Sequence, residues 1–377
     1  MLNHSLRLGR IAGIEIAVHW SWIIIFILLT WSLALFFFPP LFPFWSVGTY
    51  WIVGAVSSLL LFASVLAHEL GHSLVAKSEG IPVESITLFV FGGVSSIERE
   101  PQTARQEFFM AAAGPATSLV IGGVCYGLIR LLGGVIASPI VGVLLAMAIY
   151  NVVLAIFNLI PGFPLDGGRV FRAIVWGATG SFHEATAAAT LVGQVFAYLF
   201  IFGGLLLAIT GAFVSGLWLV FIGWFLNNAA AASRRQAEVS ELLQGVRVSA
   251  VMTTNPATVP ADTTILDFVE TYILGRNLRV VPVVSDRDHI VGLVSLREVR
   301  TVPRDAWSRT PVSAVMLPLS RLAVATPDEP LTRALEDLSR QDLNQLPVVM
   351  DGHLVGLLTR GNIVRYIRVR EELKRAA

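Results

Sequence analysis

Two histidines and a glutamate lie inside a segment that is otherwise apolar and long enough to cross a bilayer. The segment 57–75 contains the motif His68-Glu69-x-x-His72. On a helix, His68 and His72 project from the same face, so both imidazoles can bind one metal ion. Glu69 lies beside them, where its carboxylate would take a proton from water at the metal. Because ionisable groups within a membrane are costly, two core histidines explain the motif less well than a zinc hydrolase site does.

A second motif supplies a further metal ligand. The sequence Asn158-x-x-Pro161-x-x-Pro164-x-Asp166-Gly-Gly ends a later apolar run, and its prolines and glycines break the helix there. If the apolar runs alternate across the membrane, this break lies on the same side as the histidines. Asp166 is then well placed as a third zinc ligand, with the fourth position left for water. The single cysteine, Cys125, excludes a cysteine-rich metal site.

The elements that carry both motifs are membrane spans. Hydrophobic residues make up 55% of the chain and the mean hydropathy is +0.71, which is typical of a membrane protein. Six runs approach the ~20 residues that a bilayer needs. We expect these spans at about 15–38, 48–76, 107–132, 140–160, 188–210 and 213–232. The net charge of only +1 gives no basic surface for nucleic acid.

The basic residues that flank the spans predict their orientation. With six alternating spans, one side receives only Arg130. The other side receives Arg7, Arg10, Lys77, Arg99, Arg105, Arg169, Arg172, Arg234 and Arg235. The positive-inside bias therefore predicts an integral protein of the cell membrane with both termini in the cytoplasm.

The segment 86–97 predicts two short strands around a Gly92-Gly93 turn. Such a hairpin could simply cover the membrane domain. Alternatively, its edge could pair with an extended substrate, in which case Gly92, Gly93 and Val94 would contact the substrate backbone.

The two motifs together resemble those of the site-2 protease family of intramembrane zinc metalloproteases, and the resemblance covers about residues 1–232. It implies one zinc ion on His68, His72 and Asp166, with Glu69 as general base. It also implies that Asn158 contacts the substrate backbone or the developing oxyanion. The implied substrate is a single-span, membrane-bound regulatory protein.

The rest of the chain is more polar and contains a repeat. After an expected linker at 233–246, Val-Ser-Ala-Val-Met occurs at both 248–252 and 312–316. Each repeat predicts a β-α-β-β-α unit. The repeats, about 247–303 and 311–370, resemble a tandem pair of cystathionine-β-synthase (CBS) domains, so we expect a soluble, cytoplasmic α/β module over 247–377. Such pairs commonly bind adenine nucleotides, regulate an attached domain and form homodimers.

The chain departs from the CBS family at the positions expected to bind nucleotide. The resemblance places Ser295 and Thr359 where a hydroxyl would contact phosphate or ribose. Three residues later the family has aspartate, but this chain has Glu298 and Asn362. A module that dimerises or gates without nucleotide is the alternative.

The fold class that we expect is thus an α-helical membrane domain with a small β-hairpin, followed by a CBS pair. The expected function is an intramembrane zinc endopeptidase regulated by that pair. A CBS-regulated transporter or a non-cleaving scaffold is the alternative, although the ionisable groups gather at one site instead of lining a path across the membrane.

Overall fold

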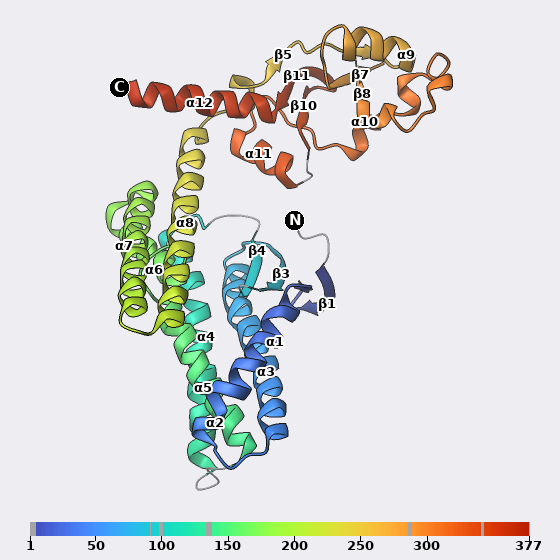
Figure 1. Cartoon of the computed structure of the whole chain (residues 1–377). Coiled ribbons are helices and arrows are strands. Elements are labelled where there is room, and N and C mark those ends of the chain that lie inside the picture. Colours follow the sequence, from blue (N-terminus) through green and yellow to red (C-terminus); the bar gives the residue numbers. More distant parts are fainter. Residues whose placement is uncertain are drawn as a thin grey trace. The chain divides into compact units, whose positions relative to one another are not determined.

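The computed structural model describes residues 5–90, 92–97, 101–132, 138–285, 289–340 and 343–376. Its contacts divide the chain into two compact units, Met1–Ala237 and Glu238–Ala377. Figure 1 shows the elements of both units, which are described separately below.

Within the described residues, six helical segments are long and apolar enough to cross a membrane. The first, Trp22–Leu41, combines α1 (Trp22–Ser32), a π-helical turn (Leu33–Phe37) and α2 (Phe38–Leu41). The others are α3 (Val47–Ser78), α4 (Ala104–Leu131), α5 (Pro139–Asn158), α7 (Phe182–Ile209) and α8 (Phe213–Leu243). This confirms the expected class of fold, an integral membrane protein with six apolar helices.

The first span begins later than the sequence suggested. We expected it to begin near residue 15, but Ile14–His19 forms strand β2 and the helix starts at Trp22. Strand β2 pairs in parallel with β3 (Val83–Phe89), and Ile14 and Ile16 are buried against the membrane helices. Their hydrophobicity therefore serves packing of a sheet instead of contact with lipid.

The expected hairpin is part of a four-stranded sheet in the order β1-β2-β3-β4. Strand β1 comprises Ser5–Ile11 and strand β4 comprises Gly92–Ile97. Phe89 pairs with Gly92, so Gly92 and Gly93 lie in β4 and not in the turn. Gly92 has a φ of +124°, a conformation that favours glycine. Strand β4 is an outer strand of the described sheet, and it packs against α3.

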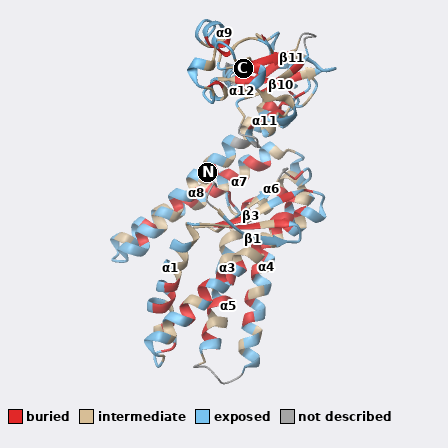
Figure 2. Ribbon diagram, turned by 90° about the vertical axis from the view of Figure 1, so that its right-hand side faces the viewer, coloured by how far each residue is buried: buried red, intermediate tan, exposed pale blue. Residues whose placement is uncertain are grey.

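A short helix, α6 (Asp166–Thr179), follows the second motif, where the sequence suggested only a break. It packs against both α4 and α7. Buried residues gather where α3, α4 and α5 pack together, whereas fewer residues of α7 and α8 are buried (Figure 2). The outward residues of these helices are large and apolar, as contact with lipid requires.

The second unit contains two similar halves. The first half contains β5 (Thr253–Thr254), β6 (Val259–Pro260), α9 (Ile265–Phe268) with a π-helical continuation (Val269–Leu274), β7 (Val280–Val284), β8 (Ile290–Ser295) and α10 (Leu296–Val299). The second half contains β9 (Leu317–Pro318), α11 (Leu331–Arg340), β10 (Gln345–Met350), β11 (His353–Thr359) and α12 (Arg360–Ala376). Short 3₁₀ turns occupy Val248–Ala250, Arg304–Ala306, Val312–Ala314 and Leu319–Arg321.

The two halves exchange their first strands. Strand β5 pairs with β11 of the second half, and β9 pairs with β8 of the first. The sheets are therefore ordered β10-β11-β5 and β6-β7-β8-β9, and neither half completes its sheet alone. The segment 233–246, expected as a linker, is helical as far as Leu243, and Leu243 is buried in the core of the second half.

Candidate metal centre

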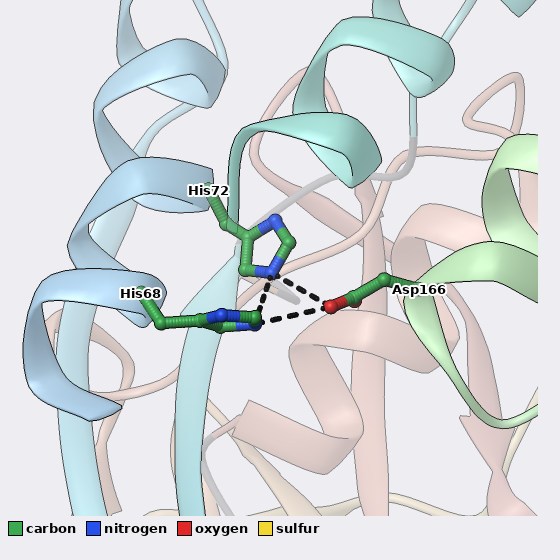
Figure 3. Close-up of side chains that lie close together, drawn as sticks. All are labelled: His68, His72 and Asp166. Carbon is green, nitrogen blue, oxygen red and sulfur yellow. Dashed lines mark hydrogen bonds and ion pairs between the residues drawn. The ribbon is translucent and has the colours of Figure 1, made fainter. Parts of the chain in front are cut away.

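Three side chains from two helices converge on one point in the first unit. His68 and His72 extend from α3, and Asp166 extends toward them from the first turn of α6 (Figure 3). Asp166 Oδ2 lies 3.1 Å from His68 Nε2 and 3.2 Å from His72 Nε2. The two Nε2 atoms are themselves 3.2 Å apart. The structure thus brings together the three residues that the sequence predicted as ligands, although Asp166 lies 98 residues after His68 and 94 residues after His72 in the chain.

The spacing of these atoms suits a tetrahedral cation. With zinc–ligand distances of ~2.0–2.1 Å, ligand atoms on a tetrahedron lie roughly 3.3 Å apart. The three observed separations of 3.1–3.2 Å are close to that value. One proton could satisfy only one of the three pairs, whereas one metal ion can bind all three atoms. Two nitrogens and one oxygen form the donor set that catalytic zinc sites commonly use.

Hydrogen bonds on the far side of each imidazole orient its Nε2 toward this point. His72 Nδ1 lies 2.7 Å from the carbonyl oxygen of Met110, and His68 Nδ1 lies 2.9 Å from Ser118 Oγ. Because a carbonyl only accepts, His72 Nδ1 carries the proton, and Nε2 of the neutral ring is free to bind a metal. Both partners belong to α4, so this helix determines the orientation of both rings.

Glycine at position 114 leaves room for the two rings. A Cβ atom there would lie 2.6 Å from His68 Nε2 and closer still to the ring of His72. Gly114 lies in α4 between Met110 and Ser118. The face of α4 that orients the imidazoles therefore also approaches them too closely for any side chain at its centre.

Glu69 is held by the outer strand of the sheet. Ser95 Oγ donates a hydrogen bond to Glu69 Oε2 at 3.0 Å, and Ser73 Oγ lies 3.3 Å from Ser95 Oγ. A Cβ at Gly93 would lie 3.0 Å from the Glu69 carboxyl carbon and nearer still to Cγ. Strand β4 thus packs directly onto the carboxylate of the motif, at the position where the sequence predicted a contact with substrate.

Asp166 owes its position to the glycines that follow it. Cβ atoms at Gly167 and Gly168 would collide with the backbone of Leu159 and of Gly162. The loop after α5 therefore folds back onto the first turn of α6. Burial alone would raise the pKa of Asp166, but the two adjacent imidazoles outweigh it and hold the pKa well below its usual range. Asp166 is therefore a carboxylate, as a metal ligand must be.

The remaining predicted site residues of the first unit lie at the end of α5 and in strand β4. Asn158 is the half-buried last residue of α5, and it hydrogen bonds to none of the three converging side chains in the described structure. Gly92 and Val94 lie in β4 on either side of Gly93, and Val94 is exposed. Their contact with substrate stays a prediction.

Sequence reasoning missed four groups around the centre: Met110, Gly114, Ser118 and Ser95. Gly114 and Ser118 belong to a pattern of small residues that usually indicates close helix packing. Met110 contributes only its backbone carbonyl, for which the sequence has no signature. The hydroxyl of Ser95 becomes important only because strand pairing brings β4 next to α3.

In the second unit, the two predicted nucleotide contacts serve local helix caps. Ser295 caps α10 and donates its hydroxyl to Glu298, and Thr359 donates its hydroxyl to Asn362 at the start of α12. Asn362 Nδ2 in turn donates to Thr253 Oγ1 at 3.2 Å, which links the two halves of the unit. Each hydroxyl is thus engaged with the residue at which the chain departs from the CBS pattern.

Comparison with known proteins agrees with both units. Residues 56–141 and 128–202 match peptidase family M50, and residues 248–305 and 312–369 each match the CBS domain. A relative from Mycobacterium tuberculosis, "Putative zinc metalloprotease Rip3", is 40% identical over 371 residues, which are 98% of this chain and 94% of the relative. "Putative zinc metalloprotease sll0528" from Synechocystis is 37% identical over 373 residues, or 97% and 96% of the two chains.

A solved site-2 protease from Methanocaldococcus jannaschii is 30% identical, with a match over 61% of this chain and 95% of that chain and a TM-score of 0.43. The match to the Mycobacterium tuberculosis relative extends along nearly the whole of both proteins. The chain therefore belongs to peptidase family M50, the family of the site-2 proteases, and carries a pair of CBS domains after its membrane helices.

Proposed function

We propose that this member of the M50 metallopeptidases hydrolyses peptide bonds within or near the transmembrane segments of membrane-bound regulatory proteins. The observation that carries the proposal is the convergence of His68 Nε2, His72 Nε2 and Asp166 Oδ2 within 3.2 Å of one another, beside Glu69. Membership of the family makes the chain a metalloprotease. Six apolar helices support a substrate that lies in the membrane.

In this proposal His68, His72 and Asp166 would hold one zinc ion, and Glu69 would act as general base. The zinc ion would act as a Lewis acid toward the scissile carbonyl and would acidify water at the site. Glu69 would accept a proton from the attacking water and deliver it to the departing amine. Ser95 would keep the carboxylate of Glu69 in position for both transfers.

The substrate would bind as an extended strand beside β4. A peptide bond in a helix has its carbonyl hydrogen bonded within the helix, so the substrate must unwind before attack. Strand β4 is an outer strand with Gly92, Gly93 and exposed Val94, which supports pairing of backbones at this edge. Asn158 would contact the substrate backbone or the oxyanion that develops from the carbonyl.

The distribution of the basic residues that flank the spans supports an orientation with both termini and the CBS pair in the cytoplasm. The partners of the protein would thus be the bilayer, a single-span substrate and a second copy of the chain that binds through the CBS domains. Adenine nucleotide would bind near Ser295 and Thr359 and shift an equilibrium between active and inactive states. No feature supports nucleic acid as a partner.

The proposal is tested by cleavage of a single-span substrate in detergent, with zinc content measured in the same samples. Glu69→Gln should keep one zinc ion and lose cleavage by at least about a hundredfold. Asp166→Asn and His72→Ala should lose zinc and cleavage together. The matched control is Glu79→Gln, which neutralises an exposed glutamate at the end of α3 and should behave as wild type.

Two results would contradict the proposal. A folded wild-type protein that binds no zinc would remove the metal centre. Equal cleavage by wild type and Glu69→Gln would remove Glu69 from its role as base and would assign the activity to a contaminating protease.

A further inference from the structure

One face of α4 contacts both of the elements that supply the converging side chains. Glu107, Met110, Gly114 and Ser118 are spaced three, four and four residues apart, so they line a single face of this helix. The side chains of Glu107, Met110 and Ser118 are 0–1% exposed. Met110 and Ser118 orient the histidines of α3, as described above. Glu107 lies on the same face one turn before Met110, and it faces α6 instead of α3.

Glu107 is bound there by an arginine of α6. Arg172 Nε donates to Glu107 Oε1 at 2.8 Å, and Arg172 Nη2 donates to the same oxygen. The guanidinium carbon lies 4.8 Å from the ring centroid of Phe163 and 4.5 Å from that of Phe182. Phe163 belongs to the loop between α5 and α6, and Phe182 begins α7. Arg172 therefore fastens α6 to α4 and to the segments on both sides of α6.

General stabilisation explains this pair poorly. Glu107 is buried and Arg172 is largely shielded from solvent, with 0% and 11% of their side chains exposed. The desolvation of two such charges can exceed their attraction, so a buried ion pair is weak support for stability and is better known for fixing one register. In addition, Glu107 Oε2 has no hydrogen-bond partner among the described residues. The pair does fix the position of α6. The guanidinium of Arg172 donates to a carboxylate and lies between two aromatic rings, and this arrangement tolerates little displacement.

We infer that Glu107 and Arg172 are positioning residues that fix α6 on α4 and thereby hold Asp166 Oδ2 against the two histidines. One face of helix α4 then orients all three of the converging side chains. The histidines depend on Met110 and Ser118, and the aspartate depends on Glu107 through Arg172 and the rigid first turns of α6. This inference rests on the metal centre proposed above.

The test is the affinity and geometry of metal binding by the full-length protein in detergent. Arg172→Lys keeps the charge but loses the second donor and the planar stacking surface. Glu107→Gln keeps the shape of the side chain but loses its charge. We expect either change to weaken zinc binding by roughly tenfold or more, and to alter the visible absorption spectrum of the cobalt-substituted protein, which reports coordination geometry. Arg105→Gln, which removes an exposed charge two residues from Glu107, is the matched control and should leave both measurements unchanged.

The double change Glu107→Leu with Arg172→Met covers the case in which single variants do not fold, because apolar pairs often replace buried ion pairs without loss of stability. A folded double variant with weak zinc binding and an altered cobalt spectrum would support the inference. Wild-type zinc affinity and an unchanged spectrum in that variant, or in a folded single variant, would overturn it. Failure of the proposed metal centre is distinguished by the wild type, which would then bind no zinc at all.

Discussion

Ser95 Oγ in strand β4 donates a hydrogen bond of 3.0 Å to Glu69 Oε2 in helix α3. The carboxylate that would act as base is thus oriented by a sheet that belongs to a different part of the chain. Because Gly93 packs onto the same side chain, a shift of β4 would move or release Glu69. A substrate strand that pairs with β4 would therefore bind beside the group that activates the water.

Replacement of Ser95 by alanine should slow cleavage without removing zinc. Loss of one hydrogen bond to a charged group corresponds to ~1.5–3 kcal/mol, part of which solvation of Glu69 restores. We expect kcat to fall about tenfold, with KM and zinc content close to wild type. The control is Ser96→Ala, since Ser96 is exposed and points away from Glu69 along the alternation of the strand.

Steady-state kinetics of both serine variants with one substrate tests whether Ser95 positions Glu69. Equal kcat values for the two variants would show that Ser95 does not position Glu69. Loss of zinc from Ser95→Ala would also contradict this role, because it would mean that the hydroxyl supports the metal ligands instead.

A methyl group at Gly114 should disrupt the metal centre. Its Cβ would lie 2.6 Å from His68 Nε2, which is closer than carbon and nitrogen can approach without displacement of the ring. We expect Gly114→Ala to weaken zinc binding by roughly a hundredfold, at the upper end of what misplaced ligands produce. Gly123→Ala is the matched control in the same helix, because a Cβ at Gly123 meets no atom within 4 Å.

Zinc affinity and thermal unfolding should be measured on both glycine variants. Alanine favours a helix more than glycine does, so Gly123→Ala should unfold at a slightly higher temperature and bind zinc as wild type does. If Gly114→Ala also bound zinc with wild-type affinity, α4 would not lie as close to the histidines as the structure has it.

Loss of the Ser118 hydroxyl should weaken zinc binding less than Gly114→Ala does. Ser118 Oγ lies 2.9 Å from His68 Nδ1 and fixes the direction of its ring. Groups in this position typically contribute 10–100-fold to metal affinity, and we expect about tenfold for Ser118→Ala. Competition with a zinc-binding dye measures this change, and Ser118→Thr should restore most of the affinity because it returns the hydroxyl. A variant with wild-type affinity would show that the helix alone orients His68.

The three converging residues were predictable because their chemistry is visible in the sequence. Spacing of four residues puts His68 and His72 on one helical face, and the helix-breaking prolines and glycines mark the turn that carries Asp166. The groups that hold them were not predictable. Met110 acts through its backbone, and Glu107 gains its importance only because folding brings α6, which the sequence did not reveal, against α4.

The misplaced start of the first span has a similar cause. Hydrophobicity alone does not distinguish a buried strand from the beginning of a membrane helix, and Ile14–His19 is apolar enough for either. The parallel pairing with Val83–Phe89 decides between them, and it joins segments that are distant in the sequence. In the CBS pair the repeat itself was visible, but the exchange of β5 and β9 between the halves was not.

A single substitution in the second CBS repeat should strengthen binding of AMP. The side chain of Asn362 accepts a hydrogen bond from the hydroxyl of Thr359 and donates one to Thr253 Oγ1 at 3.2 Å. The CBS family, which this module resembles, has aspartate at this position. Asn362→Asp removes the donor to Thr253 and supplies a carboxylate for the ribose hydroxyls. We expect the dissociation constant for AMP to fall about tenfold, which corresponds to one additional charged hydrogen bond of ~1.5 kcal/mol. Calorimetry on the full-length protein measures this, with Thr359→Ala as the variant that should weaken binding. If AMP bound to neither the wild type nor Asn362→Asp, the CBS pair would act without this nucleotide, and dimerisation would be the better explanation of its presence.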